Sequence, residues 1–214
     1  MATPKSRAKR RKARGTRPVA KPIAKAAAAL PRPREIVSAG EVRARIETLA
    51  AVVARDFVGR LPLFVVIAEG ARRFADALKL ALTGRGVAID TVVVKARRTV
   101  GRDLVDVVVD DFDAKRCTGR DLLVVDDIAD EGRTMTAVLA RAHSVRPKSV
   151  KTAVLVSKHA RRCMPIELDY VGFDVADGWV VGFGMDLDGK YRELDHLAVV
   201  EESKGAAAPA KEPS

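Results

Sequence analysis

The chain has 214 residues, of which 48% are hydrophobic and 31% are charged; this is usual for a globular protein and enough for one α/β domain with a full core. Its net charge of +11 comes from the N-terminus, because the first 34 residues contain twelve lysines and arginines and no acid. The rest of the chain has 27 basic and 28 acidic residues, which argues against a basic nucleic-acid-binding fold, and no apolar run is long enough to span a membrane.

Both ends of the chain are predicted to be disordered tails around one domain at residues 35–203. Residues 1–34 mix lysine and arginine with alanine and proline and carry no sustained apolar face, and residues 204–214 are also of low complexity. The first tail could be a transit peptide, a basic arm that contacts nucleic acid weakly and without sequence preference, or a solvated extension, which is favoured. Cys117 and Cys163 have no metal-ligand spacing and indicate a cytoplasmic protein with reduced thiols.

Strands and helices are expected to alternate along the domain. A capping box at Ser38 begins the first helix, and apolar residues at helical spacing predict two more, around residues 74–82 and after Gly132. Strands are predicted at residues 63–67, 87–94, 104–109, 122–125 and 150–156, with a polar loop at residues 95–103. This order predicts an α/β fold with a doubly wound, mainly parallel sheet.

The most informative segment reads LLVVDDIADEGRTM and starts at Leu122. Its four apolar residues are typical of a parallel strand buried on both faces, so Asp126 and Asp127 would emerge at the carboxyl edge of the sheet, where such folds bind their ligands. After Gly132 the pattern becomes helical, which places residues 130–134 at a helix start. Unpaired backbone N–H groups and the helix dipole attract an anion there, so the segment indicates a phosphorylated sugar ligand.

Three other structures could produce an acid pair of this kind. A receiver domain has its acid-ending strand near the N-terminus, whereas this strand follows more than a hundred residues of chain. A nucleotide hydrolase needs a Gly-x-x-x-x-Gly-Lys-Ser/Thr loop, which this sequence lacks. An ordinary aspartate-rich turn remains an alternative as long as the segment is considered alone.

The segment resembles the signature of the type I phosphoribosyltransferases: two acids with apolar flanks, a third acid, a small or polar residue, glycine, a variable residue and threonine. Three later motifs follow in order and are similar to the hypoxanthine-guanine branch of that family. They are Asp169–Phe173, Gly178–Phe183 and the pair Met185-Asp186 with Tyr191–Leu194. The resemblance covers about residues 60 to 200. It implies a type I phosphoribosyltransferase fold in which these C-terminal motifs form a small hood over the base.

The resemblance also implies ligands and site residues. The substrates would be phosphoribosyl pyrophosphate and a 6-oxopurine base, the product a purine monophosphate, the cofactor Mg²⁺, and the assembly a homodimer or tetramer. Asp126 and Asp127 would hold the ribose hydroxyls, and Asp130 would be the general base. The 5′-phosphate would be bound by Asp130, Glu131, Gly132, Arg133 and Thr134. The base would contact Lys158, Trp179 and Val180, the pyrophosphate would contact Glu69, Gly70 and Arg192, and Asp186 would coordinate Mg²⁺.

Simpler structural roles remain open for several of these residues. One acid of the pair could cap the next backbone turn, and Asp130 could cap the helix. Lys158 could be a solvated strand end, and Trp179 could belong to the core. The three histidines have no ligand spacing and are interpreted as structural.

Two loops depart from the family pattern. The pyrophosphate loop of the family has a basic or polar residue before its glycine, and a cis peptide that does not involve proline. This chain instead has Glu69-Gly70-Ala71, which brings a negative charge toward pyrophosphate. The lid segment, Lys95–Arg102, lacks the family's Ser-Tyr pair. The leading hypothesis is a purine phosphoribosyltransferase; the alternatives are a catalytically degenerate relative that binds purine nucleotides in a regulatory role, and a nucleic-acid-associated protein acting through its basic tail.

Overall fold

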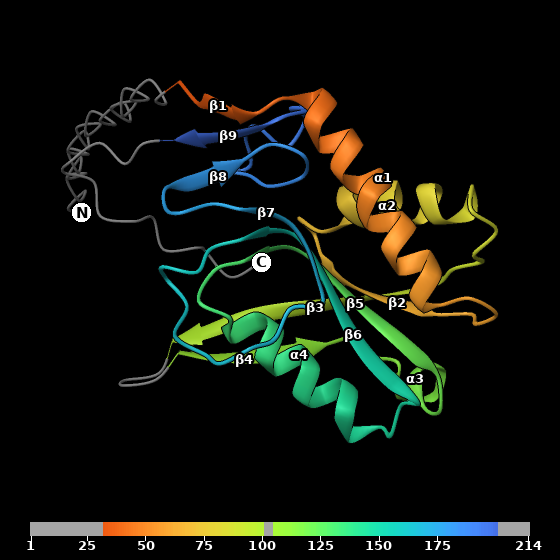
Figure 1. Cartoon of the computed structure of the whole chain (residues 1–214). Coiled ribbons are helices and arrows are strands. Elements are labelled where there is room, and N and C mark those ends of the chain that lie inside the picture. Colours follow the sequence, from red (N-terminus) through yellow and green to blue (C-terminus); the bar gives the residue numbers. More distant parts are fainter. Residues whose placement is uncertain (1–31, 101–104, 201–214) are drawn as a thin grey trace, which may run out of the picture. The chain divides into compact units, whose positions relative to one another are not determined.

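The computed structural model describes residues 32–100 and 105–200 (Figure 1). The first strand, β1 (Arg34–Val37), begins one residue before the predicted domain boundary at residue 35. Almost all of the predicted N-terminal tail and the whole of the C-terminal tail lie outside the described residues. Within the described part of the chain, no helix is both long enough and apolar enough to cross a membrane.

The main sheet has six strands in the order β4-β3-β2-β5-β6-β7. Every neighbouring pair is parallel except β3 and β4, so the predicted α/β fold with a mainly parallel sheet is confirmed. The two central strands are fully buried over most of their length, as their apolar runs require. The six strands are β2 (Leu63–Ala68), β3 (Asp90–Val100), β4 (Val105–Asp110), β5 (Asp121–Ala129), β6 (Ser149–Ser157) and β7 (Tyr170–Asp174).

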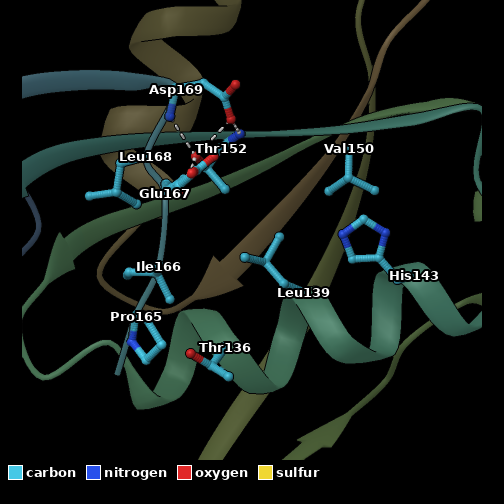
Figure 2. Close-up of a pocket in the computed structure, with 10 residues that line it drawn as sticks. All are labelled: Thr136, Leu139, His143, Val150, Thr152, Pro165, Ile166, Glu167, Leu168 and Asp169. Atoms are coloured by element: carbon cyan, nitrogen blue, oxygen red, sulfur yellow. Dashed lines mark hydrogen bonds between the residues drawn. The ribbon is translucent and has the colours of Figure 1, made fainter. Parts of the chain in front are cut away.

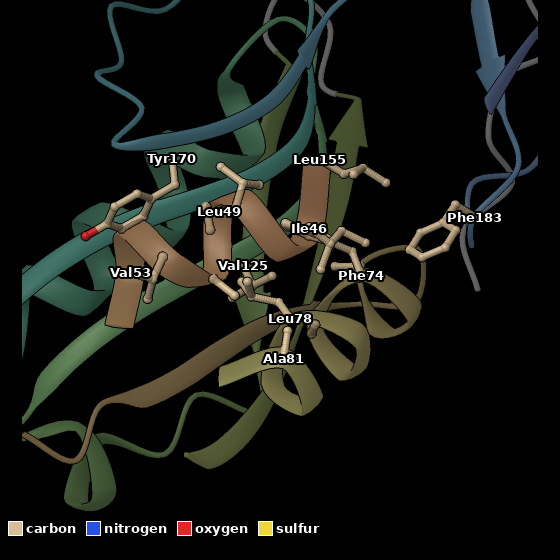
Figure 3. Close-up of a cluster of buried hydrophobic side chains, with 14 of the residues drawn as sticks. Ile46, Leu49, Val53, Phe74, Leu78, Ala81, Val125, Leu155, Tyr170 and Phe183 are labelled. Atoms are coloured by element: carbon tan, nitrogen blue, oxygen red, sulfur yellow. The ribbon is translucent and has the colours of Figure 1, made fainter. Parts of the chain in front are cut away.

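Helices cover both faces of this sheet. A separate hydrophobic core lies on each face, and successive side chains of β5 point into opposite cores. Val125 packs with α1 (Ala39–Asp56) and α2 (Arg72–Thr83), and Val124 packs with α4 (Arg133–Ser144). Figure 3 shows the first core, where Ile46, Leu49 and Val53 of α1 meet Phe74 and Leu78 of α2. The short helix α3 (Ala114–Cys117) precedes β5.

The capping box predicted at Ser38 is present at the start of α1. The Ser38 hydroxyl accepts a hydrogen bond from Glu41 N at 3.3 Å, and the Glu41 carboxylate accepts one from Ser38 N at 2.8 Å. Both bonds satisfy backbone donors that the first helical turn would leave unpaired. The cap fixes where the helix starts, and thereby which apolar face α1 presents to the core.

Replacing Ser38 by alanine is expected to lower the free energy of unfolding by about 1 kcal/mol, because one N-terminal helix donor loses its partner. Urea unfolding followed by circular dichroism measures this change. Thr48→Ala is the matched control: Thr48 is an exposed hydroxyl of the same helix that donates only back to Ala44 O, and its loss should change stability by less than about 0.5 kcal/mol. Equal losses in the two variants would contradict the capping role.

A second, three-stranded sheet has the order β1-β9-β8 and is antiparallel throughout. Its other strands are β8 (Trp179–Val181) and β9 (Leu197–Val200). The prediction of a small C-terminal hood is confirmed for the later motifs, but Asp169–Phe173 belongs mostly to β7 of the main sheet and not to the hood. No pattern in the sequence indicated β1, a short strand without a buried residue that is defined by its pairing with β9.

The predicted polar loop at residues 95–103 is wrong in its first half. Strand β3 continues to Val100 and pairs with β4 in an antiparallel ladder from Lys95 to Val100. Charged side chains suggested a loop, but on an edge hairpin they are compatible with a strand because both of its faces can reach solvent at that end. Part of the segment interpreted as a mobile lid is therefore a regular strand.

Candidate active site at the carboxyl edge of the sheet

Most of the predicted site residues lie at or just beyond the carboxyl ends of the neighbouring strands β2, β5 and β6, and the others lie in the hood. Gly70 follows β2, and a β-carbon built on it would overlap the carboxylate of Asp127 from β5. A β-carbon on Gly184 of the hood would in turn meet the carbonyl oxygen of Gly70. The pyrophosphate loop thus lies between the acid pair and the hood. The Ala68–Glu69 peptide bond is cis, at the place where the family resemblance implies one.

The acid pair lies within β5, which continues to Ala129, and each carboxylate accepts a hydrogen bond from the backbone N–H of the next residue. Asp126 is buried, and its Oδ1 accepts a hydrogen bond from Asp127 N at 3.0 Å. Asp127 Oδ1 accepts one from Ile128 N at 2.9 Å. The strand continues beyond the acid pair in its ladder with β6, so no backbone turn directly follows either acid to be capped; the two bonds orient the carboxylates within the strand.

The phosphate loop has the backbone that an anion site requires. Gly132 lies in the left-handed region with φ of 87°, which residues with a β-carbon adopt only at a cost, and it precedes the first turn of α4. A β-carbon on Gly132 would come within 3.2 to 3.3 Å of side-chain atoms of Arg162, Met164 and Ile166, so little space is left behind the loop. Gly132 is the N-cap residue, and no side chain caps α4, which removes the alternative that Asp130 is a helix cap.

The phosphate loop also carries an acidic side chain between two arginines. Glu131 Oε2 lies 3.3 Å from Arg133 Nε and 3.6 Å from Arg98 Nη1. Arg98 belongs to β3, in the segment that the sequence suggested was a lid loop. Sequence reasoning did not connect it with the phosphate loop, because the two are 33 positions apart and meet only through the order of the strands.

Lys158 is buried. The alternative that it is a solvated lysine at the end of a strand is therefore wrong. Its side chain is only 3% exposed, and its backbone N–H donates to Ala129 O at 2.9 Å. Its Nζ lies 3.4 Å from Asp130 Oδ2, while Arg161 Nε lies 3.5 Å from Asp130 Oδ1. A buried ammonium without a counter-charge is unstable, so Asp130 stabilises Lys158 as well as standing at the position of the expected base.

A cavity of about 370 Å³ lies between the pyrophosphate loop and the hood. Within it, Glu69 Oε2 forms an ion pair with Arg72 Nε at 2.8 Å, so the carboxylate is turned to the first residue of α2. This pairing offsets the negative charge that the sequence suggested would repel pyrophosphate. The cavity is lined by Glu69, Arg72, Arg73, Gly184 and Arg192.

Arg73 also lines this cavity, and it was not predicted from the sequence as a site residue. Its Nη1 donates to the backbone oxygens of Arg192, Glu193 and Leu194 at 2.9 to 3.1 Å. It therefore ties α2 to the hood segment that carries Arg192. No local signal in the sequence marks this role, since all of its partners lie about 120 positions away.

Two of the predicted base-binding residues, Trp179 and Val180, and the predicted metal ligand Asp186 lie in the hood. Trp179 Nε1 donates to Asp186 O at 2.9 Å, and Val180 is buried and pairs with Val199 of β9. The Asp186 carboxylate accepts a hydrogen bond from Gly189 N at 2.7 Å and lies 2.7 Å from Arg192 Nη2. The predicted metal ligand and the predicted pyrophosphate contact are thus paired with each other.

Asp186 fits the chemistry of a magnesium ligand. Its carboxylate is 23% exposed, and Mg²⁺ binds hard oxygen ligands, commonly one or two carboxylates together with waters and substrate phosphates. The described residues contain no group of three or more acidic, histidine or cysteine side chains placed to hold a metal. A bound ion would therefore depend on substrate oxygens and water for most of its ligands.

A second cavity, of about 400 Å³, lies between α4 and the segment that leads into β7 (Figure 2). Thr152 N and Oγ1 donate to Asp169 Oδ2 at its edge, and Thr136, Leu139 and His143 reach it from α4. None of the predicted site residues lines this cavity. The cavity beside the hood, in contrast, carries three arginines, a lining that suits a polyphosphate ligand.

Comparisons with known proteins agree with this arrangement. The profile of the family described as "Phosphoribosyl transferase domain" matches residues 34–188. The hypoxanthine-guanine phosphoribosyltransferase of Bacillus subtilis is 30% identical over 167 residues, which cover 78% of this chain and 92% of that protein. That of Streptococcus thermophilus is 33% identical over 170 residues, with the same coverage. The bifunctional protein TilS/HprT of Listeria monocytogenes is 34% identical over 167 residues, but this chain spans only 26% of its length.

Solved structures give the same assignment. The hypoxanthine phosphoribosyltransferase of Trypanosoma cruzi, solved as a mutant in a ternary substrates complex, matches with a TM-score of 0.72 and 26% identity, over 80% of this chain and 96% of that one. A hypoxanthine-guanine phosphoribosyltransferase of Bacillus anthracis matches with a TM-score of 0.69 and 27% identity, over 77% and 95%. The signature strand, the phosphate loop and these relatives together show that the chain belongs to the type I phosphoribosyltransferases, in their hypoxanthine-guanine branch.

Proposed function

We propose that this phosphoribosyltransferase transfers the 5-phosphoribosyl group from phosphoribosyl pyrophosphate to hypoxanthine or guanine, as a cytoplasmic enzyme of purine salvage. The observation that carries the proposal is the buried Lys158–Asp130 pair beside the phosphate loop. An ammonium held at this place suits the exocyclic oxygen of a 6-oxopurine, and a carboxylate next to it suits the imidazole proton of the same base. The relatives of known name support this choice of base.

The proposed reaction forms a bond between a purine imidazole nitrogen and the anomeric carbon, as the bond from that carbon to pyrophosphate breaks. The nitrogen loses its proton to Asp130, and pyrophosphate leaves with the electron pair of the broken bond. Asp126 and Asp127 orient the ribose through its hydroxyls, and their negative charge favours the positive charge that develops on the ring. The phosphate loop anchors the 5′-phosphate through backbone N–H groups.

The remaining residues act on the leaving group and the base. Arg192 and Arg73 lie in the cavity where pyrophosphate would depart, and guanidinium groups match phosphate oxygens in geometry as well as charge. Asp186 would hold a magnesium ion, which when bound neutralises charge on pyrophosphate. Trp179 provides the aromatic surface on which the base stacks.

A transfer assay tests the proposal directly. Labelled hypoxanthine, guanine or adenine is incubated with the full chain, phosphoribosyl pyrophosphate and Mg²⁺, and we expect IMP and GMP but little AMP. Sedimentation of the same preparation tests the proposed homodimer or tetramer. Failure to form any product, with GMP still bound in calorimetry, would favour the degenerate, regulatory relative; the carboxylates of Glu69 and Glu131 at the two phosphate subsites are the observation that keeps this second candidate in view.

Lys158→Ala is expected to weaken the binding of GMP by about 2 kcal/mol, the value of a hydrogen bond to a charged group, and to leave the weaker binding of AMP unchanged. The matched control is Lys151→Ala, which removes a half-buried lysine of β6, the strand that Lys158 directly follows; Lys151 pairs with Asp56 and Asp169, away from the site. Calorimetry with both nucleotides measures the difference. A Lys158 variant that keeps the full preference for GMP would show that the ammonium does not read the base.

A further inference from the structure

The face of β3 that packs toward α4 ends in an arginine. Val92 and Val94 lie in the core beneath α4, and Ala96 packs against it. Because side chains alternate along a strand, Arg98 continues this face at the end of the hairpin with β4. There its guanidinium meets the loop that begins α4. Arg97, one position earlier, forms an ion pair across the hairpin with Asp110 at 2.6 Å.

Two guanidinium groups share one carboxylate oxygen at this loop. Arg98 Nη1 and Arg133 Nε both approach Glu131 Oε2, at 3.6 and 3.3 Å. These distances are longer than those of good charged hydrogen bonds, and all three side chains are between 32% and 44% exposed. Exposed pairs of this kind contribute little stability, so a stronger anion can replace the carboxylate at small cost.

A phosphate monoester is such an anion. It carries a charge of about −1.5 to −2 near neutral pH and three acceptor oxygens, against one charge and two oxygens for a carboxylate. The backbone N–H groups next to Gly132 add donors that a side chain of the same loop is less able to reach. The loop therefore offers a phosphate more partners than it offers Glu131.

We propose that Arg98 is a 5′-phosphate-binding residue of this protein, and that Glu131 keeps Arg98 and Arg133 at the loop until a phosphate displaces its carboxylate. The inference rests on the proposed function in that it adds residues to the same phosphate site. In this arrangement the strand hairpin β3–β4, and not only the loop, takes part in phosphate recognition. Glu131 lowers the affinity for phosphate but keeps both cations in position.

Calorimetry with ribose 5-phosphate and with guanosine tests the proposal, because the first ligand has a phosphate without a base and the second a base without a phosphate. Arg98→Ala should weaken ribose 5-phosphate binding about tenfold, and Arg98→Lys should recover part of the loss. Glu131→Gln should strengthen it about threefold, since it removes the competing charge. Guanosine binding should not change in any variant.

Arg97→Ala is the matched control, since it removes a neighbouring arginine of the same strand that pairs with Asp110. Ribose 5-phosphate should bind it as it binds the native protein, and the thermal midpoints of all variants confirm that they fold. Equal affinities of the Arg98 and Arg97 variants would overturn the assignment of Arg98, and weaker binding after Glu131→Gln would overturn the proposed displacement of the Glu131 carboxylate by phosphate. If the native protein binds neither ribose 5-phosphate nor GMP, the proposed function itself fails, which is a different result.

Discussion

Alanine at position 70 is expected to lower turnover about a hundredfold, since displacing a substrate-orienting group by about 1 Å has an effect of that size. The added β-carbon would overlap the carboxylate of Asp127, which we propose orients the ribose. The loop cannot move away freely, because the carbonyl oxygen of Gly70 lies against Gly184 of the hood on the other side. Either the carboxylate or the pyrophosphate loop must therefore leave its position.

Initial rates with guanine and varied phosphoribosyl pyrophosphate measure this effect. Gly40→Ala is the control, because the nearest atom to its β-carbon is Ser38 Oγ at 3.9 Å, and alanine in helix α1 should raise stability by up to about 1 kcal/mol without changing the rate. A Gly70 variant with native turnover would mean that the reaction does not depend on the position of Asp127.

The second large effect is expected at Asp130. Replacing it by asparagine should lower kcat by about 10² to 10⁴, the usual contribution of a general base. The same change removes the counter-charge of buried Lys158 and should lower the free energy of unfolding by up to about 3 kcal/mol. Rate and stability are thus predicted to fall together, for different reasons.

A double variant separates the two roles of Asp130. Asp130→Asn combined with Lys158→Gln leaves no unpaired buried charge, so stability should return toward the native value while turnover stays low. Denaturant unfolding and single-turnover rates on the two variants make the comparison. If Asp130→Asn alone keeps kcat within tenfold of the native value, Asp130 serves only as the counter-ion of Lys158.

The parts of the fold that could be predicted from the sequence are those that depend on residues close to one another in the chain. The buried strand before Asp126, the glycine at position 132 and the capping box at Ser38 are each defined by neighbouring residues, and each is found in the structure. The signature with its later motifs was specific enough to indicate the family, which the comparisons confirm. The predicted roles of the site residues remain predictions, since they concern ligands and not the chain.

The contacts that could not be predicted from the sequence join segments that are distant in the chain and depend on the order of the strands. The charged segment that ends β3 looks like a loop until it is paired with β4, and only the position of β3 in the sheet brings Arg98 to Glu131. The role of Arg73 likewise requires the hood to be in place. The Glu69–Arg72 pair is an exception: its spacing of three residues at a helix start could have been recognised as an ion pair, and this would have tempered the expectation of charge repulsion.

The pairing of β1 with β9 has a consequence for how this protein is made. The first and last strands described here are neighbours, so during synthesis β1 emerges long before its partner and has no ladder to join. The main sheet needs no residue after Asp174 and can form earlier. A nascent chain can thus present a finished phosphate loop and the buried Lys158–Asp130 pair while the hood is still absent. Trp179 and Arg192, for which we propose base stacking and a pyrophosphate contact, therefore reach their places last, when β9 pairs with β1 on one side and β8 on the other.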